Sequence, residues 1–342
     1  MSEPGHERKY KVGKNALSTE ITLYFKVICI MPLIHERHEL DMKTDPTFLA
    51  VKPYRKPKPG CMRCVLLGNM DHCLRGSVFA KMMRVLGIEV SGDPSGACCI
   101  AIKWAPWSEY NVQADDRRRV GLRHIVNDTH FSCLKSNVSR VFLEVFGYSL
   151  EVPPLTHQGP CVMKAEQNAQ HDGQVIQCPV KALKPGMVYQ KLINNSVAGG
   201  FVEDIRVPII GNRIPFAYLK YRPRETRFSN QNSRVELRET RQILTDTEMN
   251  LVLLFARRMG LDYGELDILR DREDGRIYIV DANNTPYGPP NQIGEEEGEL
   301  AVDLSARAFF VEFIARTRNA PPSCTPTMTQ CSTVKTDCPF LN

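Results

Sequence analysis

The sequence predicts an α+β fold in which a small unit of alternating strands and helices precedes a longer region of strands joined in hairpins. Three observations support this prediction. Strand and helix patterns alternate between residues 65 and 103, hairpin-like pairs of strands recur after residue 159, and one amphipathic helix spans 247–259. With 342 residues, the chain has room for two or three structural units and a sizeable core.

The composition is that of an ordinary soluble protein, with 42% hydrophobic and 24% charged residues and a net charge of +5. No apolar run approaches the roughly 20 residues that a membrane span needs. The run 21–34 is interrupted by Lys26, and Glu3, Glu7 and Glu20 precede it, which makes it a poor signal peptide. Basic residues are not interleaved with aromatic ones as in a nucleic-acid groove. We expect a cytoplasmic protein that binds neither membrane nor nucleic acid.

Twelve cysteines are scattered along the chain. Several lie in apolar strand-like runs, where a reduced, buried cysteine acts as a small hydrophobic residue. Cys61 and Cys64, with His72 and Cys73 downstream, have the composition of a zinc site, but no second Cys-x-x-Cys follows at a workable spacing. We therefore favour the interpretation that Cys64 opens a buried strand.

The N-terminal part of the chain predicts an extension followed by a small α/β domain. Residues 1–60 are charged and end in alternating Lys and Pro, which support neither a helix nor a sheet, so we expect a flexible extension and linker. The domain at 61–129 reads as a parallel βαβ unit. Its expected elements are strand 65–67, helix 77–86 ending at Gly87, and strands 88–90 and 98–103.

The second half predicts hairpin strands and a well-defined helix. Helix 247–259 repeats apolar residues at helical spacing, with Thr245 or Asp246 as N-cap and Gly260 at its end. Residues 319–342 are rich in Pro, Ser and Thr and form an expected disordered tail. The other expected elements are helices 137–146 and 303–316 and strands 159–165, 174–176, 187–193, 201–210, 214–221, 264–269 and 276–282.

The hairpin from Gly264 to Asn284 carries the most informative pattern. Side chains alternate along a strand, so Asp281 and Asn283 point to the same face. Asp267 is another carboxylate between apolar residues on the partner strand, and burying it without a counter-charge costs several kcal/mol or more. These oxygen ligands suit Mg²⁺, which also keeps waters and substrate phosphates in its shell. The alternative is a hairpin whose polar face meets solvent.

Several short segments occur in an order that is typical of one superfamily. They are Cys133-Leu134-Lys135-Ser136, Gly147-Tyr148, Val162-Met163-Lys164, Tyr189-Gln190-Lys191-Leu192-Ile193, Glu203-Asp204-Ile205-Arg206-Val207, Arg227-Phe228-Ser229-Asn230, Leu266-Asp267-Ile268-Leu269 and Val280-Asp281-Ala282-Asn283-Asn284. With these segments, residues 130–290 resemble an ATP-grasp domain. Within that superfamily they are most similar to the amino-acid ligases related to the ribosomal-protein glutamate ligase.

The resemblance implies an ATP-grasp fold, in which two α+β subdomains at 130–190 and 191–318 enclose ATP after a small N-terminal α/β domain. That first domain would supply part of the acceptor site, for which Asn69, Trp104 and Trp107 are candidates. The resemblance implies that Lys135, Lys164 and Gly173 bind the phosphates, and that the hinge Gln190, Lys191, Leu192 and Ile193 contacts adenine. The implied metal ligands are Asp267, Asp281 and Asn283. The implied catalytic residues are Arg206 and one of Arg222, Arg224 or Arg227, of which we favour Arg227.

Three positions depart from the pattern of the superfamily. The phosphate loop 167–173 keeps a single glycine, although only glycine lets backbone approach phosphate freely. Asp281 stands where the superfamily has a metal-binding glutamate, and its side chain is one methylene shorter. Lys191 stands where a hinge glutamate is usual.

The predicted function is that of an ATP-dependent ligase with ATP and Mg²⁺ (or Mn²⁺) as cofactors. It would activate a small-molecule or peptide carboxylate as an acyl phosphate and couple it to an amine. The alternatives are a kinase with the same grip on ATP, and an ATP-binding regulatory protein with weak turnover. A homodimer is a further expectation, because dimers are frequent in the superfamily.

Overall fold

The computed structural model describes residues 62–74, 76–95, 98–105, 125–129 and 132–315. The expectations for 1–60 and 319–342, for Cys61 and for Trp107 lie outside these residues. Within them, no helix is both long and apolar enough to cross a membrane.

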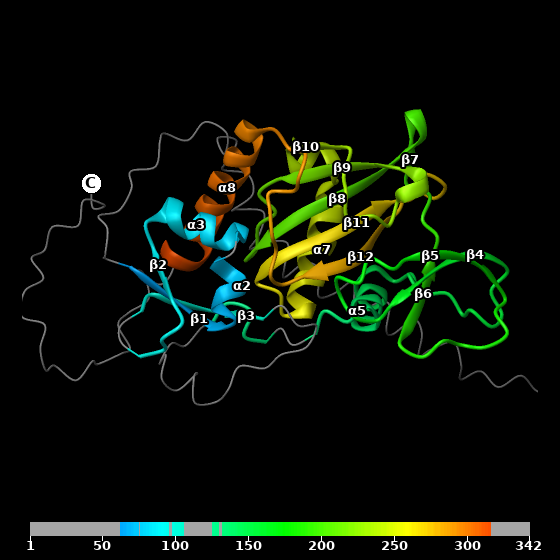
Figure 1. Cartoon of the computed structure of the whole chain (residues 1–342), viewed down its shortest axis with the longest axis horizontal. Helices are drawn as coiled ribbons and strands as arrows, with labels where there is room; N and C mark the ends of the chain where they lie inside the picture. Colours follow the sequence, from blue (N-terminus) through cyan, green and yellow to red (C-terminus); the bar gives the residue numbers. More distant parts are fainter. Residues whose placement is uncertain (1–61, 75, 96–97, 106–124, 130–131, 316–342) are drawn as a thin grey trace, which may run out of the picture. The chain divides into compact units, whose positions relative to one another are not determined.

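The N-terminal unit is the predicted parallel βαβ arrangement (Figure 1). Its elements are β1 (Arg63–Gly68), α2 (Met70–Leu74), α3 (Val78–Leu86), β2 (Glu89–Ser91) and β3 (Ile100–Trp104). The strands lie in the order β2-β1-β3, with both pairs parallel. Helix α3 begins because the Ser77 hydroxyl accepts from Ala80 N, and it ends at Gly87, whose φ of 66° is left-handed.

A three-stranded antiparallel sheet follows helix α5 (Lys135–Phe146), in the order β5-β4-β6. Its strands are β4 (Gly159–Ala165), β5 (Gln174–Cys178) and β6 (Met187–Lys191). The predicted bounds of β4 are confirmed. Strand β6 ends at Lys191, two residues before the predicted Ile193. The chain turns after β6, where Asn195 N donates a hydrogen bond to Ile193 O at 3.2 Å.

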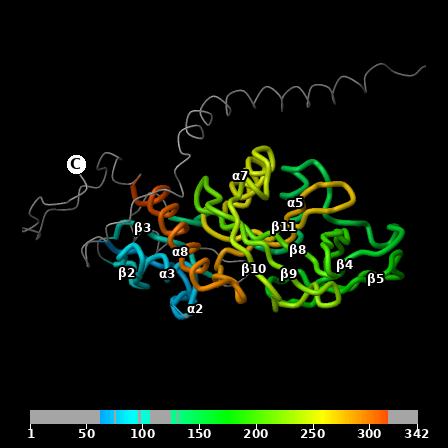
Figure 2. Tube along the Cα trace, turned by 90° about the horizontal axis from the view of Figure 1, so that it is seen from above, coloured from blue at the N-terminus to red at the C-terminus, as the bar shows by residue number. Residues whose placement is uncertain are grey.

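The largest sheet has the antiparallel order β10-β9-β8-β11-β12, with β7 beside β8. Its strands are β7 (Ser196–Val197), β8 (Phe201–Ile210), β9 (Ala217–Pro223), β10 (Arg234–Arg238), β11 (Tyr263–Arg270) and β12 (Ile277–Asn283). One face of this sheet packs on α5 and α7 (Asp246–Met259) in the main hydrophobic core. Figure 2 shows these two helices on the same side of the strands. The other face packs aromatic residues at one end, where Tyr263 contacts Phe79 and Phe309, and carries charged side chains beyond them.

Several elements differ from the prediction. Strand β9 begins at Ala217 rather than at 214, because Pro215 lacks an N–H for the ladder. Helix α8 (Glu295–Phe309) begins eight residues before the predicted 303 and continues as the π-helix η3 (Phe310–Ala315). Three acidic residues in its first turn favour a helix start there. Strand β10 and the short helices α2 and α6 (Thr240–Ile243) have no predicted counterpart.

The start of α7 leads to a prediction about pH. The Glu248 carboxylate accepts from Thr245 N at 2.9 Å and from Arg270 Nη1 at 2.7 Å. Burial raises the pKa of Glu248, but the hydrogen bonds from Arg270 and Thr245 outweigh it and hold the pKa below its usual value. We expect Glu248→Gln to lower the free energy of unfolding at pH 7 by about 1 kcal/mol. Because the folded-state pKa is depressed, this stabilisation is present above the unfolded-state pKa and disappears as pH falls through the folded one.

Urea unfolding of the wild type and of Glu248→Gln at pH 7 and pH 3 measures this difference. The control is Glu144→Gln, which removes an exposed ion pair with Arg140 on α5 and should change stability little. An equal loss of stability at both pH values would contradict the role of the Glu248 carboxylate.

Candidate functional site

Four adjacent strands place charged side chains on the face of the large sheet that α5 and α7 leave open. Asp281 on β12 lies opposite Asp267 on β11, and Asp267 lies opposite Arg206 on β8. On the next strand, β9, Lys220 lies opposite Asp204 of β8. A β-bulge follows this row, because Asp267 pairs with Asp281 but Ile268 pairs with Ile279, which leaves Val280 of β12 as the extra residue. A row of charges therefore crosses one face of the sheet and is offset by two residues between Arg206 and Lys220.

A cavity of about 590 Å³ covers this row. Its wall includes the β4–β5 loop 168–173, the segment 227–232 and the segment 283–291. Eight predicted site residues line it: Lys135, Lys164, Gly173, Arg206, Arg227, Asp267, Asp281 and Asn283. The predicted hinge residues 190–193 do not. From the N-terminal unit His72 lines the cavity, whereas Asn69 and the buried Trp104 do not.

Lys135 and Lys164 lie at one end of the row, beside Asp281. Lys135 is the first residue of α5; its Nζ donates to Gln167 O at 2.8 Å and lies 3.9 Å from Asp281 Oδ1. Lys164 on β4 donates to Val280 O at 3.0 Å. Burial lowers the pKa of Lys164 to about 8, because the ammonium loses hydration that the nearby Asp281 only partly replaces.

Asp281 fits the predicted role of a metal ligand. Its Oδ1 is buried and has no hydrogen-bond partner, and burial raises the pKa of its carboxyl. The side-chain oxygen of Asn283 accepts from Thr285 N at 3.0 Å. Among the described residues, no group of three His, Cys, Asp or Glu side chains could hold a metal by itself. A Mg²⁺ ion that keeps waters and substrate phosphates needs fewer protein carboxylates.

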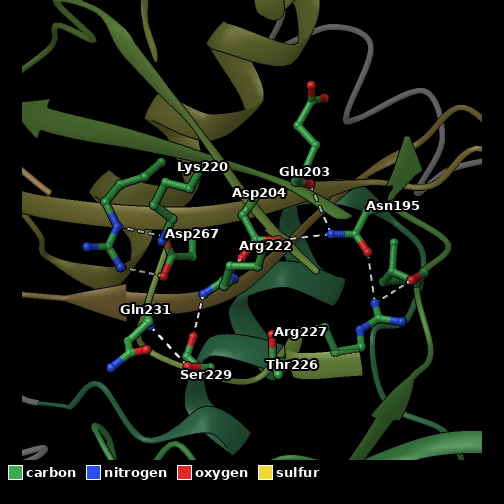
Figure 3. A network of polar contacts seen from close by, with 12 residues as sticks. Asn195, Glu203, Asp204, Lys220, Arg222, Thr226, Arg227, Ser229, Gln231 and Asp267 are labelled. Atoms are coloured by element: carbon green, nitrogen blue, oxygen red, sulfur yellow. Dashed lines mark hydrogen bonds and ion pairs between the residues drawn. The ribbon is translucent and has the colours of Figure 1, made fainter. Parts of the chain in front are cut away.

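Asp267 is engaged differently. Its two oxygens accept from Arg206 Nε and Nη2 at 2.8 Å each, and its Oδ1 also accepts from Lys220 Nζ at 3.0 Å (Figure 3). Burial raises the pKa of Asp267, but the charges of Arg206 and Lys220 outweigh it and hold the pKa far below its usual value. The metal-binding role of Asp267 stays a prediction. It requires a carboxylate lone pair that does not accept from Arg206 or Lys220.

Lys220 is a cavity residue that the sequence reasoning missed. It lies between Leu219 and Tyr221 in strand β9, whose residues from Ala217 to Arg222 are all buried, and it lines the cavity. The signal was present, since a lysine in an apolar strand needs a partner just as Asp267 does. Its partner is 47 residues away in the chain, so only the sheet order reveals the pair.

The guanidinium groups of Arg222 and Arg227 are held by neighbouring residues (Figure 3). Arg227 Nη2 donates to Ile193 O at 2.9 Å and to Asn195 Oδ1 at 2.8 Å. Arg222 pairs with Asp204, and its Nη1 donates to the backbone O of Ser229 at 2.9 Å. Arg227 thus links the segment after β9 to the connection after β6, and its predicted catalytic role stays a prediction.

The side chains of the predicted hinge take part in packing and ion pairs. Lys191 Nζ lies 2.7 Å from the fully buried Asp271 and 3.0 Å from Asp274, both in the β11–β12 turn. Gln190 Nε2 donates to Ser139 Oγ of α5 at 3.2 Å. The ion pair with the buried Asp271 therefore explains why a lysine stands at position 191.

The single glycine of the β4–β5 loop is required by an aromatic contact. A Cβ on Gly173 would lie 2.6 Å from the Phe228 ring, far closer than side chains approach one another. The loop also has left-handed backbone at two ordinary residues, Ala169 with φ 59° and His171 with φ 50°. Asn168 Nδ2 reaches Ala282 O at 3.3 Å. The loop therefore contacts both β12 and the segment after β9.

This contact predicts how the loop responds to substitution. Gly173→Ala should displace either the loop or Phe228 and weaken binding of anions in the cavity by at least about tenfold, or about 1.4 kcal/mol. Phe228→Ala in the same chain should restore part of the affinity, because it removes the clash. Calorimetric titration of the two single variants and the double variant with inorganic pyrophosphate measures the coupling. Additive effects would show that the contact does not control the loop.

Comparison with known proteins gives no match to a family model and no match to a curated protein. Solved structures do match. VanG D-Ala:D-Ser ligase from Enterococcus faecalis has a TM-score of 0.50 at 8% identity over 75% of this chain and 99% of its own. D-alanine–D-alanine ligase from Bacillus anthracis complexed with ATP has a TM-score of 0.46 at 12% identity, over 75% and 99%.

A third solved structure is the ATP-grasp ligase PsnB complexed with a precursor peptide and AMPPNP. It has a TM-score of 0.44 at 14% identity over 75% of this chain and 100% of its own. The likeness to VanG D-Ala:D-Ser ligase, with a TM-score of 0.50 at 8% identity, concerns the fold alone. The chain has the ATP-grasp fold that its sequence predicts.

Proposed function

We propose that this protein binds Mg-ATP in the cavity and transfers the γ-phosphoryl group to a carboxylate, so that an amine can then displace the phosphate. The observation that carries the proposal is an excess of buried positive charge. The cavity is lined by six cations and four carboxylates, and the buried Glu265 beside Arg206 adds a fifth carboxylate. The cations are Lys135, Lys164, Arg206, Lys220, Arg222 and Arg227, and the lining carboxylates are Asp172, Asp204, Asp267 and Asp281.

The lysines also have unused hydrogen-bonding capacity. An ammonium group has three N–H donors. Lys135, Lys164 and Lys220 each donate one hydrogen bond, to Gln167 O, Val280 O and Asp267 Oδ1. Burying an ammonium with unfilled donors is costly, so a polyanion in the cavity would stabilise all three. A triphosphate keeps a net negative charge when one Mg²⁺ is bound, and it is long enough to reach several cations.

Each residue group has a role in the proposed reaction. Lys135 and Lys164 hold the phosphates, and Asp281 with Asn283 holds Mg²⁺, which would screen charge between the phosphate oxygens. A carboxylate oxygen of the acid substrate attacks the γ-phosphorus, the bond to the β,γ-bridging oxygen breaks, and ADP leaves with that electron pair. The amine then attacks the acyl carbon, inorganic phosphate leaves, and the amine loses a proton. Arg206 stabilises the charge on the transferred group.

Two alternatives share the same nucleotide site. A kinase would use a hydroxyl acceptor in place of the carboxylate. A nucleotide-binding protein with weak turnover is the second alternative, because the β4–β5 loop has a single glycine and covers phosphate less closely than a glycine-rich loop would.

The metal site gives the first test of the proposal. Asp281→Asn keeps the shape of the side chain but removes its charge, so Mg-AMPPNP should bind at least about tenfold more weakly, a loss of about 1.4 kcal/mol. The affinity for AMPPNP without Mg²⁺ should change less, because the lysines remain. Isothermal titration calorimetry measures both affinities. The control is Asp303→Asn, a half-buried carboxylate on α8 that pairs with Arg307 and does not line the cavity. An unchanged Mg-AMPPNP affinity in Asp281→Asn would place the metal elsewhere.

Product analysis separates the three functions. We expect ADP release to depend on the presence of both a carboxylic acid and an amine, with one phosphate released for each amide formed. Coupled detection of ADP and mass spectrometry of the products, over panels of small acids, amines and short peptides, measure this. A phosphorylated, phosphate-stable product would indicate a kinase. Tight nucleotide binding without ADP formation over the whole panel would indicate the regulatory alternative.

A further inference from the structure

We propose that Lys220 and Arg206 together bind the reacting carboxylate of the acid substrate, and that Asp267 acts mainly to position these two cations. This inference rests on the proposed function, since it assigns the second substrate within the same cavity. It adds Lys220 to the predicted site residues, and it narrows the role of Asp267 from metal binding to positioning.

Lys220 is nearly buried, with 4% of its surface exposed, yet it lines the cavity. Its ammonium has one hydrogen bond, at 3.0 Å to Asp267 Oδ1. Two N–H donors therefore remain in a place with little access to water. A lysine with a purely structural role would fill these donors with carbonyl or carboxylate oxygens, because an unfilled buried donor costs about 1–3 kcal/mol.

Asp267 has a charged hydrogen-bond partner for both of its oxygens without Lys220. Arg206 contacts both of its oxygens at 2.8 Å, which is the bidentate geometry that satisfies a carboxylate. Lys220 adds a second positive charge to the same carboxylate. Glu265 is also buried, and its Oε2 lies 3.5 Å from Arg206 Nη1, so its carboxylate pairs with Arg206. The Lys220 ammonium therefore keeps two N–H donors for an anion, on a cavity wall where cations outnumber carboxylates.

The position of the cluster indicates which anion this is. Asp267 lies directly across from Asp281, and the side chains of Arg206 and Lys220 both reach Asp267, on the strand next to the proposed metal and phosphate site. A carboxylate held there would have an oxygen next to the γ-phosphoryl group. After transfer, the same two cations would face the acyl phosphate. A neutral hydroxyl acceptor would leave the charge unbalanced, so the cluster favours a ligase over a kinase.

The other two arginines of the cavity wall have protein partners other than Asp267. Arg222 is held by Asp204 and Ser229 O, and Arg227 by Ile193 O and Asn195 (Figure 3). Arg222 Nε is buried without a hydrogen bond, but Asp204 already neutralises this guanidinium group. Among the described cations on this part of the cavity wall, Lys220 and Arg206 are the two that donate hydrogen bonds to Asp267.

The test measures carboxylate binding when the nucleotide site is filled. Acetate is titrated into the full-length protein saturated with Mg-AMPPNP, and its binding is followed by saturation-transfer NMR. We expect Lys220→Met to weaken acetate binding at least about fivefold while Mg-AMPPNP affinity stays within about twofold. Lys220→Arg should keep most of the acetate affinity, because it retains the charge. The control Arg234→Met removes an exposed cation on β10 of the same sheet and should leave acetate binding unchanged.

The outcomes separate this inference from the proposed function. Equal acetate binding in the wild type and Lys220→Met, or no acetate binding in the wild-type complex, would overturn the role of Lys220. An equal loss of acetate and nucleotide affinity in Lys220→Met would show that Lys220 only supports the sheet. If the wild type does not bind Mg-AMPPNP, the proposed function fails, and the acetate comparison on the nucleotide-free protein still decides the role of Lys220. Should Lys220→Met unfold, as judged by circular dichroism, Lys220→Gln takes its place in the same titration.

Discussion

The bidentate contact between Arg206 and Asp267 is the interaction on which the rest of the site depends. Asp281 lies directly opposite Asp267, and like charges in such cross-strand positions destabilise a sheet. Arg206, on the other side of Asp267, offsets this repulsion. A slip of one residue in the register would turn these charges into the core and expose apolar residues such as Leu266 and Ile268. The ion pair and the hydrophobic core therefore specify the same register.

The charged face also determines how the surrounding loops are held. Asp204 lies on the same strand as Arg206, two residues earlier, and so faces the same side. Its carboxylate pairs with Arg222 and accepts from Asn195, which in turn holds Arg227. This chain of contacts connects the strands to the segment after β9 and to the connection that follows β6. The β11–β12 turn holds that connection through Asp271 and Lys191.

The parts of this site that were predictable depend on local patterns. Alternation along β12 predicts that Asp281 and Asn283 share a face, and the order of short segments predicts the fold and the nearness of Lys135 and Lys164. Lys220 was missed because its partner is set by the strand order. Arg227 was predicted as a site residue and lines the cavity, but its contact with Ile193 O depends on how two distant segments meet and could not be predicted. The start of α8 was missed because the acidic residues from Glu295 onward hide its apolar positions.

The two facing aspartates show how one sheet can give the same residue type two environments. Asp267 is fully paired, and its pKa lies far below the usual value; Asp281 keeps an oxygen without a hydrogen bond, and burial raises its pKa. Divergent pKa values in neighbouring carboxyl groups separate their chemical roles. A cation at Asp281 would relieve the cost of its burial, and an anion at Lys220 would relieve the excess charge at Asp267. Mg-ATP beside a carboxylate substrate supplies both, so the charges that are costly to bury are those that would stabilise the bound substrates.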